Sequence, residues 1–188
     1  MATYKQIKGV TVQTKDTDPV VNAGSWSSGG DLNVARYQGG GAGVQTAASL
    51  FGGYGSPDAD HEYYNGSTWS EQTNLNSGRK SAGSGGVQTA SILFAGYTTT
   101  NVNNVETWNG SSWTEVAEVN TTRRGISSLG QTNTAILAVG GYTTTAVDNV
   151  ESWNGSAWTE IAEILTTGYS AAGSGTSTEG LIINLTPG

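Results

Sequence analysis

Short apolar runs recur along the chain, and each of them follows a stretch of glycine and other small residues. Residues 44–54 are repeated closely by residues 87–97 and more loosely by residues 132–142, and residues 176–185 form a degenerate fourth copy. Each apolar run is only six or seven residues long, and glycine lies close to it in the sequence. Runs of this length and setting are typical of short β-strands rather than of helices.

A second motif alternates with the apolar runs and joins two aromatic residues through an Asn-Gly pair. It reads Tyr-Asn-Gly-Ser-Thr-Trp at residues 64–69, Trp-Asn-Gly-Ser-Ser-Trp at 108–113 and Trp-Asn-Gly-Ser-Ala-Trp at 153–158. Asn-Gly is the preferred pair of a two-residue type I′ hairpin. We therefore predict two strands joined by that turn, with Glu106 opposite Trp113, Trp108 opposite Ser111 and both tryptophans on the same side of the hairpin.

The two motifs together define a unit of 43 to 45 residues that we read as four strands, a to d. Strand a is rich in small residues, strand b is apolar and ends in glycine, and strands c and d form the aromatic hairpin. The predicted ranges are 39–43, 81–86, 125–130 and 170–175 for strand a, and 47–53, 90–96, 135–141 and 180–185 for strand b. A four-stranded unit with this period is the blade of a β-propeller.

At this point the unit resembles the kelch family. The kelch pattern has an arginine, a small-residue strand, an apolar strand that ends in two glycines, then a glutamate, an aromatic residue and a tryptophan. The matching residues are Arg79, Ala90, Ala95-Gly96, Glu106, Trp108 and Trp113 in one unit, Glu62, Tyr64 and Trp69 in the unit before it, and Arg123, Gly140-Gly141, Glu151, Trp153 and Trp158 in the unit after it. The resemblance covers residues 20–187 and implies an all-β propeller. Ala95 and Gly168 depart from the pattern, since glycine and arginine are expected there.

The two ends of the chain indicate how such a propeller would close. The first c–d pair, at residues 19–28, has no a–b pair before it, and the last a–b pair has no c–d pair after it. Joining these halves gives a composite fourth blade and removes two exposed sheet edges. We therefore expect a small propeller of four blades over residues 19–188, with residues 1–18 as an N-terminal arm or extra strand. The alternative is an open half-propeller that another chain completes, as in a homo-oligomer.

Composition and charge exclude several other classes of protein. The 188 residues include 28 glycines and no cysteine, so there is no disulfide framework and no Cys-ligated metal site. Eight basic and 15 acidic residues give a net charge of −7, which argues against nucleic acid as a partner. No apolar stretch approaches the length of a membrane span, and residues 1–20 do not have the pattern of a signal peptide.

The few basic residues outside residues 1–18 fall at two adjacent repeat positions just before strand a. We expect these positions and the b–c connections to emerge on the same, loop-rich face of the propeller, which is where we place a binding site. Arg36, Arg79 and Arg123 occupy the first position. The alternative for them is a structural role, bonded to loop carbonyls or paired with the repeated glutamate of a neighbouring blade, for which Glu62, Glu106 and Glu151 are the candidates. The second position holds Tyr37, Lys80, Arg124 and Tyr169, and the nearby tyrosines that could serve as platforms for a sugar are Tyr54, Tyr97 and Tyr142.

The sequence gives little support for catalysis. A copper oxidase site of the kind found in some kelch proteins needs several histidines and a cysteine, whereas this chain has one histidine and no cysteine. We expect that histidine, His61, to be solvated beside Asp58 and Asp60. Sialidase-like propellers carry a hairpin motif in which one residue separates Asp from Gly, and here Asn directly precedes Gly. We therefore expect no enzyme activity, no metal and no cofactor.

The arm and the short tryptophan-rich units together resemble virion-associated kelch-repeat proteins of tailed phages from aquatic environments. That resemblance implies a particle-surface location, with the arm contacting other virion proteins and the loop-rich face binding a glycan or protein on the host surface. Two alternatives remain: an intracellular propeller that binds a protein partner such as an acidic peptide, and, much less favoured, a glycan-acting hydrolase.

Overall fold

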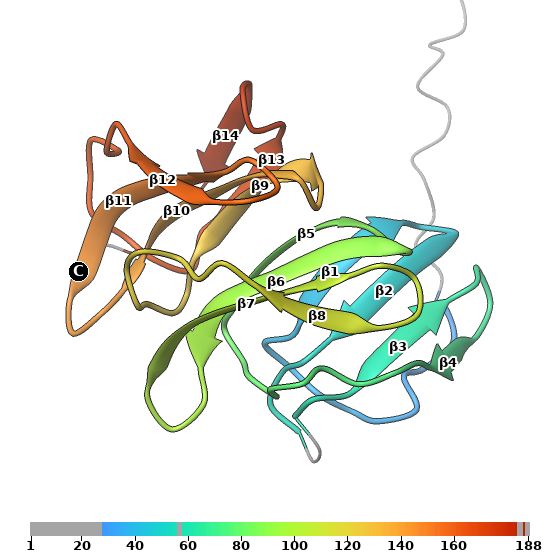
Figure 1. The fold of residues 1–188 in the computed structure, drawn as a ribbon. Coiled ribbons are helices and arrows are strands. Elements are labelled where there is room, and N and C mark those ends of the chain that lie inside the picture. The colour runs from blue at the N-terminus through green and yellow to red at the C-terminus, as the bar shows by residue number, and fades with distance from the viewer. Residues whose placement is uncertain (1–27, 56–57, 184–185, 187–188) are drawn as a thin grey trace, which may run out of the picture.

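The computed structural model describes residues 28–55, 58–183 and 186, and within these ranges the protein consists of β-strands joined by turns (Figure 1). The expected all-β class is thus confirmed. The strands are β1 (Gly40–Val44), β2 (Ala47–Phe51), β3 (His61–Tyr64), β4 (Trp69–Glu71), β5 (Gly83–Val87), β6 (Ala90–Tyr97), β7 (Asn101–Trp108), β8 (Trp113–Val116), β9 (Ser127–Thr132), β10 (Ala135–Tyr142), β11 (Ala146–Trp153), β12 (Trp158–Ile161), β13 (Ala172–Gly175) and β14 (Gly180–Ile183). The described part of the chain contains no helix long and apolar enough to cross a membrane.

The strands form three antiparallel four-stranded sheets and one two-stranded sheet, an arrangement consistent with a small propeller-like fold. The four-stranded sheets run in the orders β1-β2-β3-β4, β5-β6-β7-β8 and β9-β10-β11-β12, and β13 pairs with β14. We call the three four-stranded sheets, in this order, blades one, two and three, and we call the β13–β14 sheet blade four. Strand a of each blade lies next to strand a of the following blade, so β1, β5, β9 and β13 are consecutive neighbours. The same four strands line a cavity of about 600 Å³.

Small residues allow the inner strands to approach one another closely. A Cβ atom at Gly173 would lie 2.2 Å from the Ser128 carbonyl oxygen, which leaves no room for a side chain. Serine hydroxyls bond the inner strands together: Ser84 Oγ donates to the Gly41 carbonyl at 3.1 Å, and Ser128 Oγ donates to the Ser84 carbonyl at 2.7 Å. The glycine and serine content of strand a therefore follows from the close approach of the inner strands and from the hydrogen bonds between them.

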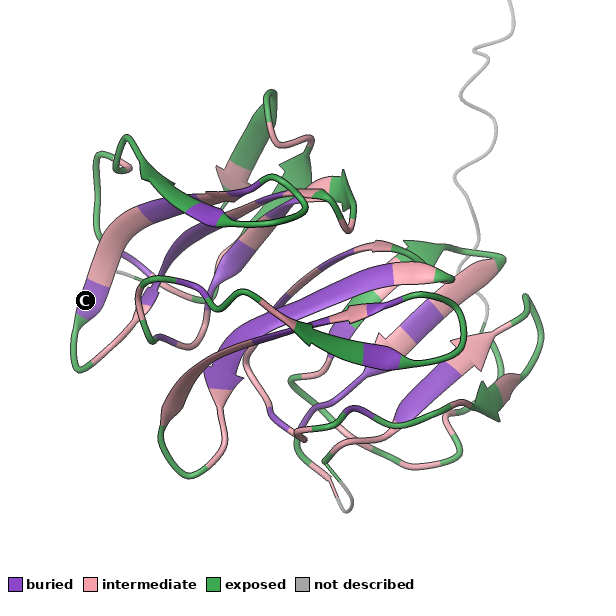
Figure 2. Ribbon diagram, viewed as in Figure 1, coloured by how far each residue is buried: buried purple, intermediate pink, exposed green. Residues whose placement is uncertain are grey.

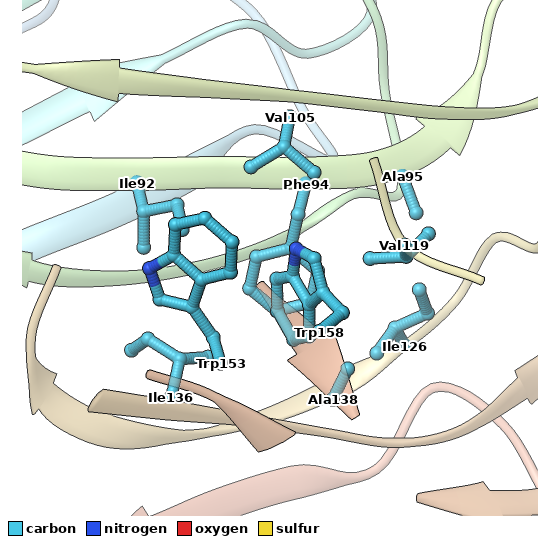
Figure 3. Packing of buried hydrophobic residues seen from close by; sticks show 10 residues of the cluster. All are labelled: Ile92, Phe94, Ala95, Val105, Val119, Ile126, Ile136, Ala138, Trp153 and Trp158. Carbon is cyan, nitrogen blue, oxygen red and sulfur yellow. The ribbon is translucent and has the colours of Figure 1, made fainter. Parts of the chain in front are cut away.

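The hydrophobic core lies between the blades, in layers that repeat from one blade to the next. Figure 3 shows Trp153 and Trp158 of blade three packed against Ile92 and Phe94 of blade two. The preceding interface has the same design, with Trp108 and Trp113 on Phe51 and Leu75. Burial is accordingly greatest along the middle strands of blades two and three (Figure 2). These four tryptophans are core residues.

The aromatic hairpin differs from the predicted two-residue turn. Trp108 lies opposite Trp113 and Glu106 opposite Glu115, so four residues rather than two form the connection. The Asn109 side chain explains the difference, because its Oδ1 accepts the backbone N–H groups of Ser111 and Ser112 at 3.0 Å each. An Asx turn of this kind needs positive φ only at Gly110, where φ is 97°. The two tryptophans do share a side, with ring centres 5.4 Å apart.

The connection between strands b and c is short in blade two. Strand β6 continues to Tyr97 and strand β7 begins at Asn101, so only residues 98–100 remain as the turn. A register shift between Phe94 and Gly96 interrupts the pairing, and Ala95 there has a φ of 54°. This irregularity coincides with the expected double glycine and precedes Tyr97.

Blade four contains only strands β13 and β14 in the described part of the chain. The expected partner strands, at residues 19–28, and the expected arm, at residues 1–18, lie outside the described residues apart from Ser28. The predicted closure of the ring is therefore a proposal, to which we return below.

Candidate functional site

Four equivalent residues lie together at the loop-rich end of the inner strands β1, β5, β9 and β13. Gln38, Ser81, Gly125 and Ser170 all have left-handed backbone conformations, with φ of 59°, 52°, 62° and 55°. Each of the last three donates its backbone N–H to the carbonyl of the residue before it in this series, at 3.0, 2.8 and 2.7 Å. This hydrogen-bonded series fixes the backbone from which the neighbouring candidate side chains project.

The residue before each of these positions pairs with the end of strand b. The isolated bridges join Tyr37 with Tyr54, Lys80 with Tyr97, Arg124 with Tyr142 and Tyr169 with Thr186. Seven of the ten predicted binding residues thereby meet on one face, and we call them the tyrosine–cation belt: Tyr37, Tyr54, Lys80, Tyr97, Arg124, Tyr142 and Tyr169. The residue before strand a and the residue at the end of strand b, which the sequence places in adjacent connections, are thus direct neighbours in space.

Cations and aromatic rings alternate along the tyrosine–cation belt. Lys80 Nζ lies 4.0 Å from the ring centre of Tyr54 and 5.7 Å from that of Tyr97, and Arg124 Cζ lies 4.8 Å from the ring centres of both Tyr97 and Tyr142. These distances are within the range of cation–π attraction. At the ends of the series, Tyr37 contacts Tyr54 and Tyr142 contacts Tyr169, with ring centres 5.0 and 5.3 Å apart. The belt therefore continues across the junctions between blades.

Two adjoining hollows lie beside the tyrosine–cation belt, and we call them together the rim pocket. One, of about 330 Å³, is lined by Gln38, Ser81, Arg124, Gly125, Tyr142, Tyr169 and Ser170. The other, of about 240 Å³, is lined by Gln38, Lys80, Ser81, Tyr97 and Arg124. Apart from Gly125, every lining residue carries a polar or aromatic side chain, and Arg124 borders both hollows. Such a lining suits a polar ligand with flat faces better than an aliphatic one.

The other three predicted binding residues, Arg36, Arg79 and Arg123, are buried inside the blades. Their guanidinium groups contact Glu62, Glu106 and Glu151 respectively, and side-chain exposure is at most 1% in all three pairs. Each arginine pairs with the glutamate of the blade that it enters, not with that of a neighbouring blade. These side chains do not reach the surface of the loop-rich face, so the structure places them in the structural role that the sequence offered as the alternative.

Each buried glutamate also receives backbone hydrogen bonds from the connection that leads into its blade. Glu106 accepts the N–H groups of Asn76 at 2.8 Å and Ser77 at 3.3 Å, in addition to Arg79 Nη1 at 2.6 Å. Burial lowers the pKa of Arg79, and the hydrogen bond and charge of Glu106 act in the opposite direction. The carboxylate thus ties the connection to strand β7, which sets the position from which Lys80 projects.

His61 is fully buried rather than solvated, which corrects the sequence-based expectation. Its Nε2 lies 3.0 Å from Ser49 Oγ, and Trp113 Nε1 donates to its Nδ1 at 3.2 Å across the interface with blade two. Burial is the main cause that lowers the pKa of His61 from 6.5 to about 4, and the positive charge of Arg36 adds to the shift. A neutral imidazole in this environment is a core residue and has no access to a ligand.

Comparisons with known proteins add no family to this description, because neither a scan against protein-family models nor a search of curated proteins finds a match. Within residues 28–55, 58–183 and 186, no cluster of three or more His, Asp or Glu side chains is arranged to hold a metal ion.

Sequence reasoning missed part of the site. Gln38, Ser81 and Ser170 line the rim pocket, and Asn101 bonds to Arg124, yet none of these residues is among the predicted binding residues. The signal for the first three is their register, since each directly follows a position of the tyrosine–cation belt. Asn101 has no such signal, because its neighbour in space is 23 residues away in sequence.

Proposed function

We propose that the protein is a non-catalytic binding module that holds a carbohydrate against the tyrosine–cation belt on its loop-rich face. The single observation that supports this proposal most strongly is the alternation of tyrosine rings with Lys80 and Arg124 beside an open polar pocket. Sugar rings have apolar C–H faces that stack on aromatic rings, and their hydroxyl groups bond to polar side chains such as Gln38 and Ser81. Tyrosine offers both kinds of contact in one side chain.

The non-catalytic part of the proposal rests on where the reactive groups lie. Glu62, Glu106 and Glu151 are buried and neutralised by arginine, and His61 is enclosed between two blades. A general acid or base must reach the substrate within hydrogen-bonding distance. None of these four groups borders the rim pocket.

A glycan array tests the proposal directly. We expect the wild-type chain to bind a defined subset of glycans, and Tyr97→Ala and Tyr142→Ala to reduce that binding about tenfold, since a lost stacking and polar contact costs on the order of 1.4 kcal/mol. Gln131→Ala is the matched control, because Gln131 is exposed and lines the cavity at the inner strands rather than the rim pocket. Thermal unfolding confirms that each variant is folded. Absence of glycan binding by the folded wild-type chain overturns the proposal.

The particle-surface location is a further part of the proposal. It is supported by the resemblance of the tryptophan-rich units to virion-associated phage proteins, and it assigns residues 1–18 to attachment and the loop-rich face to the host surface. Mass spectrometry of purified particles from the source of the chain tests the location. Stoichiometric recovery with the particles is expected, and consistent absence from them contradicts this part.

We also propose that the chain closes its own ring, with residues 19–28 completing blade four. Ile183 is 49% exposed, whereas its repeat counterparts Phe51, Phe94 and Val139 are at most 2% exposed, so this blade lacks the cover that the others have. Trp26 stands in the register of Trp69, Trp113 and Trp158. Neither half of the composite blade carries a residue of the Arg–Glu pair. Gly168 stands at the arginine position of the C-terminal half, and Pro19 stands at the glutamate position of the N-terminal half. Composite pairing therefore leaves no buried charge without a partner.

A further inference from the structure

Arg124 differs from the repeated arginines of the scaffold because nothing in the described structure neutralises it. The four ion pairs among the described residues involve Arg36, Arg79 and Arg123, and neither Arg124 nor Lys80 takes part in one. The protein nevertheless carries a net charge of −7. Two adjacent cations without carboxylate partners, bordering the same hollow, are therefore a local exception to the charge of the molecule.

The Arg124 guanidinium is held in place in a way that leaves one edge open. Tyr97 and Tyr142 both lie 4.8 Å from its central carbon, and Nη1 donates to Asn101 Oδ1 at 2.8 Å. Asn101 is itself fixed, because its Nδ2 donates to the carbonyls of Tyr142 at 3.0 Å and Thr143 at 2.8 Å. The Nε and Nη2 groups make no hydrogen bond within the described part of the protein. A planar guanidinium can bind a carboxylate or sulfate through two parallel N–H groups of this kind.

The propeller repeat shows that this arrangement is not required by the fold. The positions equivalent to Arg124 hold Tyr37, Lys80 and Tyr169, and the position equivalent to Asn101 in blade three is Ala146. Scaffold features such as the Arg–Glu pairs recur in every complete blade, whereas the Arg124–Asn101 pair occurs once. Arg124 and the asparagine that fixes it do not recur at the equivalent positions of the repeat. Their pairing therefore points to a ligand.

We propose that Arg124, with Lys80 beside it, is the receptor for a sulfate or carboxylate group of an acidic polysaccharide. The inference rests on the proposed function and names the ligand class for the same face. Both hollows of the rim pocket lack an aliphatic side chain in their lining, which favours a hydroxyl-rich polymer over a peptide with apolar anchors. The tyrosine–cation belt extends to either side of Arg124, so neighbouring sugar rings of the same polymer can stack on Tyr54, Tyr97 and Tyr142.

Affinity electrophoresis of the full chain at physiological salt tests this assignment. The probes are dextran sulfate, polygalacturonate, unmodified dextran and polyglutamate. We expect retardation by dextran sulfate, by polygalacturonate or by both, and the probe that retards more strongly identifies the anionic group. Arg124→Tyr, which installs the residue found at positions 37 and 169, should weaken that binding about tenfold or more, because it removes the charge-assisted hydrogen bonds to the anion. Asn101→Ala, which installs the residue of blade three, should weaken it to a smaller extent.

Gln131→Ala is the control, since Gln131 lines the cavity at the inner strands rather than the rim pocket, and it should change the affinity less than about twofold. Equal retardation by neutral and sulfated dextran, abolished by Tyr97→Ala and unaffected by Arg124→Tyr, overturns the anion site but leaves the proposed carbohydrate function intact. Polyglutamate binding of equal strength and equal dependence on Arg124 overturns the polysaccharide assignment. Failure to bind any of the four polymers also overturns the inference, while a positive glycan array would still support the broader function.

Discussion

Two tryptophans in equivalent places differ in one hydrogen bond, and the cause is a single residue on the facing blade. Trp113 Nε1 donates to His61, whereas Trp158 Nε1 is buried and has no hydrogen-bond partner among the described residues, because Val105 occupies the position equivalent to His61. An unpaired buried N–H costs on the order of 1–3 kcal/mol. The tryptophan N–H at the interface between blades one and two is thus hydrogen-bonded, whereas the equivalent N–H between blades two and three is not. The difference depends on His61 remaining neutral.

We predict that His61 makes stability sensitive to mild acid. The unfolded histidine binds a proton near pH 6.5, while the folded one stays neutral down to about pH 4, so the unfolded state holds more protons in between. The free energy of unfolding should therefore be fully retained above pH 6.5 and should fall, by up to about 1.4 kcal/mol per pH unit, as the pH drops toward 4. Urea unfolding of the wild type and of His61→Val measures this. Parallel pH dependence in the two proteins would show that His61 is not the cause.

The sequence could not have predicted this burial from its local pattern. His61 has Asp58, Asp60 and Glu62 nearby in sequence, and such neighbours are typical of a solvated segment. The ring is buried because Trp113, from the next blade, covers it at a sequence distance of 52 residues. Register gave a usable hint, since the equivalent positions hold Val105 and Val150, both buried.

At the scale of elements, the repeated Arg–Glu pair joins a connection to the third strand of its blade. In blade two the Glu106 carboxylate receives Arg79 and two backbone N–H groups, and Arg79 Nη2 also donates to the Leu93 carbonyl at 3.2 Å. Such a pair contributes little if both charges are replaced, but the loss of one partner leaves the other buried and uncompensated. The sequence indicated these arginines and glutamates but suggested pairing between neighbouring blades, whereas each pair lies within one blade. Burial of both side chains shows that the pair is structural.

We predict that Arg79→Met lowers the free energy of unfolding by about 3–5 kcal/mol, because the Glu106 charge then has no counterion. Glu106→Gln should also destabilise, and the double variant should cost clearly less than the sum of the two single changes. Chemical denaturation of all four proteins gives the coupling energy. Strict additivity would contradict a direct interaction between the two side chains in solution.

The inner strands provide a second test at this scale, because their glycines are not equally constrained. A Cβ atom at Gly83 would lie 2.2 Å from the Phe94 ring, whereas at Gly41 the nearest atom would be 3.6 Å away. We predict that Gly83→Ala destabilises the protein by about 1–3 kcal/mol through overpacking, and that Gly41→Ala is close to neutral. Thermal unfolding compares the two. Equal effects would show that chain flexibility, not packing, sets the cost.

At the scale of the whole molecule, the period of 43 to 45 residues was enough to predict an all-β, propeller-like arrangement of blades. The turn within the aromatic hairpin was not predictable from Asn-Gly alone, because Asn109 serves as a hydrogen-bond acceptor for the turn rather than as a residue with positive φ. The order of rings and cations in the tyrosine–cation belt also depends on the contact between blades. Sequence could place Lys80 and Tyr97 in adjacent connections, but not Lys80 over Tyr54 of the preceding blade.

Closure of the ring by residues 19–28 leads to a prediction about assembly. The full chain should be monomeric, and deletion of residues 1–18 should leave the melting temperature nearly unchanged. Deletion of residues 1–27 should lower it by several degrees, since about 1 kcal/mol corresponds to 2–4 °C for a chain of this size, and should promote self-association through the uncovered edge of β14. Light scattering coupled to gel filtration measures the mass. A full-length chain that elutes as a stable dimer would favour completion by a second copy.

The side-by-side order of the blades also determines which parts of the molecule open locally to solvent. Strand β6 belongs to blade two, one of the two blades with a described neighbour on both sides. Six of its eight residues are buried, whereas β13 has none buried. In a linear stack the end units open most readily, because they lose only one interface. Amide protons of β6 would then exchange with solvent last and those of β13 and β14 first. A closed ring has no end unit, and its amides would exchange in a single cooperative event.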